Sequence, residues 1–143
     1  MITQSYIKMC EQADEIQKAW KPKLLDKVIT KRTLTNNNYS QNAVGYIEDF
    51  EHPYDEYYYK NYGYIYLPTQ EQLQEMVKGK VFHIWGTFDS LDLAVASIDR
   101  KKRDSHKVCN KIKSFNELWL AFVMHEKYNK IWIGEKWILK EGV

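Results

Sequence analysis

The sequence of 143 residues predicts an α+β fold in a single domain, 1–143, with about four helices packed on a small, mainly antiparallel sheet. Three observations support this class. Several segments repeat apolar residues at three- and four-residue steps, which is typical of amphipathic helices. Shorter segments between them are rich in tyrosine and isoleucine, which favours strands. The C-terminal region carries tryptophans on both sides of a glycine, which predicts a β-hairpin.

The first helix is predicted over residues 4–19, with Thr3 or Ser5 as its N-cap and Pro22 beyond its end. Its apolar residues recur so that they share one stripe, which should face the core. This stripe comprises Tyr6, Met9, Cys10, Ala13, Ile16 and Trp20. Cys10 is therefore interpreted as a structural thiol, because apolar burial raises the pKa of a cysteine and makes it unreactive.

Three strands are predicted in the first half, at 24–33, 43–50 and 62–67. Residues 35–42 are expected to form a loop by composition. The intervening stretch "EHPYDEYYYKN" contains Pro53, which favours a turn or an irregular sheet edge there.

A second helix is predicted after Pro68, because Thr69 and Gln72 fit a capping box and Gly79 suits the helix end. A strand at 81–85 should follow it. A third helix should begin at Asp89 or Ser90 and run into the basic cluster at 100–104.

The last helix is predicted over 115–128, with Ser114 and Glu117 as a capping box and Asn129 at a left-handed position just past its end. Phe115, Leu118, Trp119, Ala121 and Phe122 form one face, and other apolar residues point elsewhere. A helix that is apolar nearly all round must be covered on more than one side. It is therefore either the central helix of the fold or lends its second face to a partner subunit in a homodimer.

The segment "KIWIGEKWIL", residues 130–139, predicts a hairpin with Gly134 and Glu135 as its two-residue loop. This register places Trp132 opposite Trp137 and Ile131 opposite Ile138. A facing aromatic pair adds ~0.5–1.5 kcal/mol beyond the burial of its rings.

Charge and hydropathy narrow the class of protein. A net charge of +2 is too small to imply nucleic acid by itself. The two cysteines form no disulfide framework. The start of the chain has no basic and apolar leader, and no segment has the ~18 consecutive apolar residues of a membrane span. These features predict a reduced, cytoplasmic protein without membrane attachment.

Two stretches, "LPTQEQLQEMV" (67–77) and "LWLAFVMHEKYNKIWIGEKWI" (118–138), resemble a family of small uncharacterised proteins encoded by phages and prophages of Gram-positive bacteria. The matching features are a Leu67-Pro68 step, a helix rich in Gln and Glu, and a later helix followed by a hairpin that contains tryptophan. The resemblance implies a phage or prophage origin. It implies no activity and no cofactor.

Catalytic and metal-binding signals are weak. The histidines His52, His83, His106 and His125 do not pair at helical spacing, and the single His106-x-x-Cys109 step falls short of the four ligands of structural zinc. The chain also lacks common enzyme motifs: the Gly-rich motifs GxxxxGK(S/T) and GxGxxG, the serine motif GxSxG and the histidine motif HExxH. We therefore expect no catalytic residue, no metal and no cofactor, while an unrecognised enzyme remains an alternative.

A basic segment covers residues 100–113, "RKKRDSHKVCNKIK", with seven Lys or Arg against one Asp. Its candidate binding residues are Arg100, Lys101, Lys102, Arg103 and Lys107. Such a patch could bind nucleic acid or a signalling nucleotide through phosphate contacts. The alternative is a helix end followed by a solvated loop, which the absence of interleaved aromatic residues favours.

An acidic, tyrosine-rich segment covers residues 48–59, with five acids and no Lys or Arg. Its candidate binding residues are Tyr57, Tyr58 and Tyr59, because three consecutive tyrosines in any regular element leave at least one facing outward. Tyrosine is favoured at binding surfaces as a rigid, amphipathic group. The alternative is a solvated edge with one or two rings turned inward, and charge complementarity with the basic segment in a dimer is a further alternative.

The leading hypothesis is a non-catalytic accessory protein of a phage or prophage that binds a protein or other macromolecule of the host or phage. Its contact surfaces would be the tyrosine-rich segment and the exposed part of helix 115–128. The alternative hypothesis is nucleic-acid or signalling-nucleotide binding through 100–113, as in anti-defence proteins.

Overall fold

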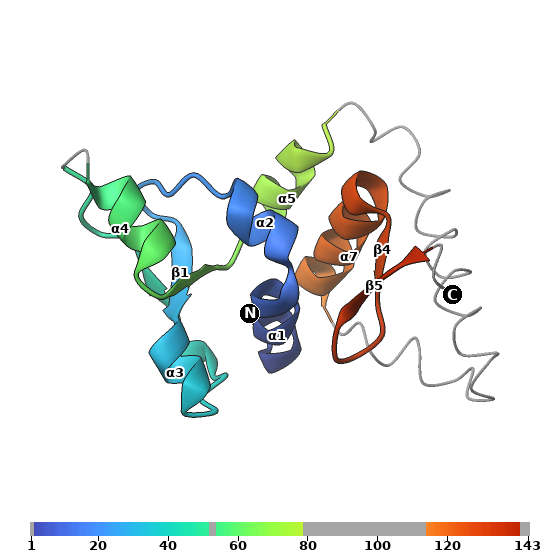
Figure 1. The fold of residues 1–143 in the computed structure, drawn as a ribbon, viewed down its shortest axis with the longest axis horizontal. Helices are drawn as coiled ribbons and strands as arrows, with labels where there is room; N and C mark the ends of the chain where they lie inside the picture. Colours follow the sequence, from blue (N-terminus) through green and yellow to red (C-terminus); the bar gives the residue numbers. More distant parts are fainter. Residues whose placement is uncertain (1, 52–53, 79–113, 141–143) are drawn as a thin grey trace. The chain divides into compact units, whose positions relative to one another are not determined.

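The computed structural model describes residues 2–51, 54–78 and 114–140. The chain divides into two compact units, 1–69 and 70–143, which are described in turn below (Figure 1). Both contain helices and short antiparallel strands, so the predicted α+β class is confirmed. The expectation of one domain stays a prediction.

The first unit opens with two helices, α1 (Gln4–Gln12) and α2 (Asp14–Ala19), where one continuous helix was expected. The helix breaks at Ala13, whose φ of −85° and ψ of 73° are not helical. Thr3 is the N-cap, as predicted, and its Oγ1 accepts a 3.0 Å hydrogen bond from the Tyr6 amide. The predicted apolar stripe is fully buried in spite of the break, because the two helices keep these residues on the core side. Its members are Tyr6, Met9, Cys10, Ala13, Ile16 and Trp20.

The sheet of this unit has three antiparallel strands in the order β2-β1-β3. They are β1 (Lys27–Thr30), β2 (Gly45–Tyr46) and β3 (Tyr64–Tyr66). All three strands were predicted, but each is shorter than expected. The chain instead turns directly from β1 into the helix α3 (Lys31–Thr35), because Thr30 acts as an N-cap and its Oγ1 accepts a hydrogen bond from the Thr33 amide. A short 3-10 turn, Gln41–Ala43, precedes β2.

A helix, α4 (Asp55–Asn61), replaces the turn or irregular edge expected between the second and third strands. Asp55 and Glu56 lie in its first turn and Lys60 in its last, an arrangement that the helix dipole favours. Gly63 follows the helix with a φ of 86°, which only glycine adopts readily. Figure 1 shows α4 in green, and it packs against β3.

The core of the first unit is built around Tyr66 of β3. Its ring stacks on Trp20 with 5.0 Å between centroids and an interplanar angle of 7°. The Gln17 side chain binds both backbone groups of Tyr66, donating to its carbonyl and accepting from its amide. Burial, followed by the charge of Asp26, raises the pKa of the Tyr66 hydroxyl. The ring contact and the Gln17 bonds fix α2 against the sheet.

The second unit contains α5 (Gln70–Met76), α7 (Phe115–Tyr128), β4 (Lys130–Trp132) and β5 (Trp137–Leu139). Helix α7 packs on α5 and on β4. Its bounds are those predicted, and so are its caps. Ser114 Oγ accepts from the Glu117 amide at 3.2 Å, and Asn129 lies in the left-handed region. The strand and helix expected at 81–85 and from Asp89 lie outside the described residues.

Helix α7 is buried on all sides along its middle, from Trp119 to Met124. This favours the interpretation of α7 as a central helix over one that needs a partner subunit to cover a second face. Phe115 is the exception: it was expected on the apolar face, yet it is 71% exposed.

Strands β4 and β5 form the predicted hairpin in the predicted register, with Trp132 opposite Trp137 and Ile131 opposite Ile138. The Ile133 amide donates to the Lys136 carbonyl, which leaves Gly134 and Glu135 as the loop. Gly134 has a φ of 100°, so glycine is required at this first loop position. The large aromatic residues Trp119, Phe122, Trp132 and Trp137 are all buried, as the composition of the segment 114–138 predicted.

Candidate functional site: a tyrosine surface on α4 and β3

Five tyrosine rings from α4, its C-terminal end and β3 contact one another in a continuous group, which we call the tyrosine surface. Its members are Tyr57, Tyr58, Tyr59, Tyr62 and Tyr64. Tyr58 lies at the centre, with its ring centroid 5.3 Å from that of Tyr62, 5.5 Å from Tyr59 and 6.0 Å from Tyr64. Tyr57 meets Tyr62 edge-on at 6.1 Å. Edge-on and offset contacts of this kind are the favourable geometries for aromatic pairs.

The rings on this surface are only partly covered. Tyr57 is 61% exposed, Tyr58 47% and Tyr62 62%, whereas Tyr59 and Tyr64 are half-buried. No residue of α4 is buried, so the helix contributes little to the core that would explain its aromatic content. Exposed aromatic groups gathered in one place are typical of interaction surfaces.

Lys60 fixes α4 in position. Its ammonium group donates to the carbonyls of Lys18 at 2.6 Å and Trp20 at 3.0 Å, at the end of α2. Two further contacts hold the preceding loop: the Glu51 amide donates to Asp55 Oδ2 at 2.8 Å, and the ring of Phe50 stacks on Tyr59. The surface is thus held by side-chain bonds and does not depend on the seven-residue helix being stable alone.

The surface carries a negative field. Burial raises the pKa of Tyr59, and the charges of Asp55 and Asp49 raise it further. Burial and the neighbouring Tyr58 likewise raise the pKa of Tyr64. Tyrosine hydroxyls are protonated at neutral pH, and these shifts extend that protonation to higher pH, so the rings offer neutral hydrogen-bonding groups.

The structure brings the predicted residues Tyr57, Tyr58 and Tyr59 together in this surface, with the first two facing outward. Sequence reasoning missed Tyr62 and Tyr64 as members, because both were assigned to a strand. Tyr54, Tyr58 and Tyr62 are spaced four residues apart, and this spacing would have placed these three rings, Tyr62 included, on one helix face. The other candidate residues, Arg100, Lys101, Lys102, Arg103 and Lys107, lie outside the described residues.

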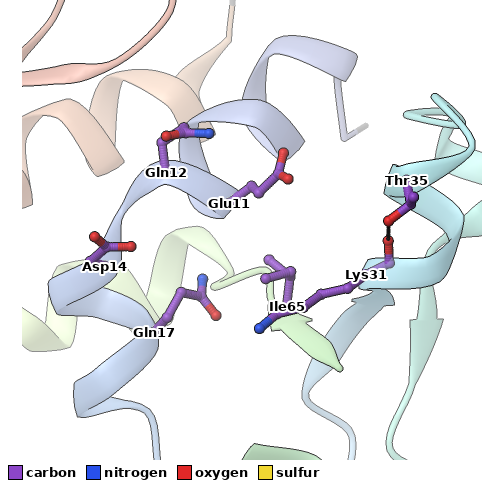
Figure 2. Close-up of a pocket in the computed structure, with 7 residues that line it drawn as sticks. All are labelled: Glu11, Gln12, Asp14, Gln17, Lys31, Thr35 and Ile65. Atoms are coloured by element: carbon purple, nitrogen blue, oxygen red, sulfur yellow. Dashed lines mark hydrogen bonds between the residues drawn. The ribbon is translucent and has the colours of Figure 1, made fainter. Parts of the chain in front are cut away.

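A hollow of about 430 Å³ lies in the first unit between α1, α2, α3 and β3. Figure 2 shows Lys31 extending from α3 toward Ile65, with Gln17 and Glu11 across the hollow. Three of the six polar side chains that line it already bond within the protein. Gln17 binds Tyr66, Glu11 accepts from the Tyr39 hydroxyl, and Thr35 donates to the Lys31 carbonyl. Ligand pockets usually have mainly apolar walls, whereas six of the seven residues that line this hollow are polar.

In the second unit, His125 lies in the last turn of α7. Burial lowers the pKa of its imidazole, and the charge of Lys140 lowers it further, against the opposing effect of Glu126. A neutral buried histidine can be a metal ligand, but the part of the chain that the structure describes holds no group of three His, Cys, Asp or Glu side chains suited to a metal. Within the same part, no helix is long and apolar enough to cross a membrane.

Comparison of the chain with models of protein families, with curated protein sequences and with solved structures finds no match. The functional argument therefore starts from the tyrosine surface itself.

Proposed function

We propose that this chain is an accessory protein that works without catalysis, by binding a partner protein on its tyrosine surface. The phage or prophage setting is part of the proposal and comes from the sequence resemblance of 67–77 and 118–138. The partner would be a protein of the host or of the phage.

The observation that carries the proposal is that the α4 rings are exposed and at the same time in contact with one another. Side chains at a binding surface must lose freedom when a partner docks, at a cost of about 0.5–1.5 kcal/mol for each flexible group. Here the ring contacts around Tyr58 and the Lys60 bonds have already fixed the surface. Tyrosines held in this way are typical anchor residues of protein interfaces.

The test is capture of a partner with the tagged full chain from an infected or lysogenic host, followed by reconstitution with the purified partner and calorimetry. We expect Tyr58→Ala to weaken binding by about 2 kcal/mol or more, as at an interface hot spot. Tyr46→Ala is the matched control, because Tyr46 is also exposed but lies on β2, at the opposite edge of the sheet from β3.

Equal binding by the wild type and the Tyr58 variant would contradict the proposal. Equal losses in the Tyr58 and Tyr46 variants would also contradict it, because the effect would then not belong to this surface. The urea midpoint of each variant shows whether lost binding reflects lost folding.

The alternative function, binding of nucleic acid or a signalling nucleotide, rests on the sequence of the basic segment, with its seven Lys or Arg against one Asp. It predicts that affinity for an oligonucleotide falls steeply between low and physiological salt. Charge reversal at Lys101 and Arg103 should abolish that binding, and unchanged binding would eliminate this alternative.

A further inference from the structure

We infer that the segment which docks on the tyrosine surface is arginine-rich. This inference rests on the proposed function and adds the chemistry of the partner, which the charges and ring faces of the first unit define.

The first step is the charge around the rings. Residues 48–61 contain five acidic residues and one cation, Lys60. The Lys60 ammonium is bound to the carbonyls of Lys18 and Trp20, so it is directed to the backbone and not to the carboxylates. Four of the five acidic residues are exposed, and the fifth, Asp55, is half-buried. These exposed acids are Glu48, Asp49, Glu51 and Glu56. A partner with positive charge would complement this surface, and a phosphate backbone would be repelled by it.

The second step is the position of these charges. Asp55 lies in the first turn of α4, the helix that carries Tyr59, and burial together with the charges of Asp55, Asp49 and Glu48 raises the pKa of the Tyr59 hydroxyl. The Tyr59 hydroxyl also donates to the Asp49 carbonyl at 3.3 Å. Anionic groups and aromatic faces therefore occupy one surface and could contact the same cationic side chain.

The third step separates arginine from lysine. A guanidinium group is planar, so it can stack on an exposed ring while its N–H groups bind a carboxylate in a bidentate manner. A lysine ammonium is a compact, strongly hydrated charge that gains less from a ring face. Tyr57 and Tyr62 are the most exposed residues of the surface, and their rings meet edge-on at an interplanar angle of 70°, while one face of Tyr62 stacks on Tyr58. This combination favours guanidinium groups along a flexible segment.

The test uses the full chain and three labelled peptides of equal length, with glycine alternating with arginine, lysine or glutamate, in fluorescence anisotropy titrations. We expect the arginine peptide to bind several-fold more tightly than the lysine peptide, and the glutamate peptide not to bind. Tyr57→Ala and Tyr62→Ala should each weaken arginine-peptide binding roughly two- to fivefold, in line with exposed cation–π contacts. Tyr46→Ala should leave it unchanged, and rising salt should weaken it.

Equal affinity for the arginine and lysine peptides, or no effect of Tyr57→Ala and Tyr62→Ala, would overturn the inference. So would tighter binding of a labelled oligonucleotide that is lost in the same variants. Sedimentation velocity supplies a further outcome: a dimer that dissociates in the Tyr57 and Tyr62 variants would identify a second copy as the occupant and overturn the inference.

The failure of this inference can be told apart from failure of the proposed function. A purified partner whose binding depends on Tyr58, together with arginine peptides that do not bind, would leave the proposed function standing and remove the arginine preference. If neither a Tyr58-dependent partner nor arginine-peptide binding is found, both the proposed function and the arginine preference are wrong.

Discussion

The indole Nε1 of Trp20 donates a 2.9 Å hydrogen bond to the buried carboxylate of Asp26, and the Lys23 amide donates to the same oxygen at 3.1 Å. Asp26 thereby closes the loop between α2 and β1. The ring of Trp20 in turn stacks on Tyr66, and the backbone carbonyl of Trp20 accepts a hydrogen bond from the Lys60 ammonium. The pair thus links the core of the first unit to the helix that carries the tyrosine surface.

We predict that Asp26→Ala lowers the free energy of unfolding by about 2–4 kcal/mol, because it leaves two N–H donors without their carboxylate. Asp49→Ala, at an exposed position, should change it by no more than about 0.5 kcal/mol. Urea unfolding followed by far-UV circular dichroism measures both. Similar small values for the two variants would mean that water replaces the Asp26 oxygen at little cost.

The two glycines Gly63 and Gly45 make a second, matched prediction. An added Cβ would meet nothing within 4 Å at either position, but only Gly63 has a positive φ, of 86°. Gly63→Ala should therefore lower the free energy of unfolding by about 1–2 kcal/mol through backbone strain alone. Gly45→Ala should be neutral or slightly stabilising, because it restricts the unfolded chain. Equal effects in urea unfolding would show that the backbone at 63 relaxes without cost.

Sequence reasoning succeeded where the signals are local. Helix α7 could be predicted to its ends because Ser114 and Asn129 mark them, and the hairpin register followed from Gly134. Helix α4 was not predicted. Pro53 and the tyrosines favour a turn or strand, whereas the contacts that hold the helix, between Lys60 and the carbonyls of Lys18 and Trp20, join residues about forty positions apart.

For the tyrosine surface too, local sequence signals predicted one part and tertiary contacts decided the rest. Three consecutive tyrosines were enough to predict outward rings, and the structure places Tyr57 and Tyr58 outward. The contact of Tyr58 with Tyr64 could not be predicted, because it depends on how α4 packs against β3. Local composition thus indicated the surface, and tertiary packing decided its members.

His125 gives a prediction about pH. Its imidazole is 9% exposed, Nδ1 lies 3.6 Å from Glu126 Oε1, and burial with the charge of Lys140 lowers its pKa below 6.5. Below pH 6.5 the unfolded chain therefore binds this proton more readily than the folded chain, so stability falls as the pH falls through 6.5 and below.

Urea midpoints of the wild type and His125→Gln between pH 8 and pH 5 test this prediction, because the other titrating groups are common to both proteins. The wild type should lose more stability than the variant as the solution is acidified. Parallel pH profiles would show that the imidazole is as easily protonated in the folded chain as in the unfolded one.

The last prediction concerns the hairpin of the second unit, where the rings of Trp132 and Trp137 face each other with 5.2 Å between centroids. Trp137→Ala removes a buried ring that the partner strand cannot replace, and should lower the free energy of unfolding by about 3–5 kcal/mol. Leu139→Ala is the matched control, because Leu139 lies on the same strand but is exposed, and it should cost no more than about 0.5 kcal/mol. Urea unfolding followed by tryptophan fluorescence and circular dichroism measures both variants. A Trp137 variant as stable as the Leu139 variant would show that the hairpin contributes little to the packing of α7, and the interior role assigned to 114–138 would then be wrong.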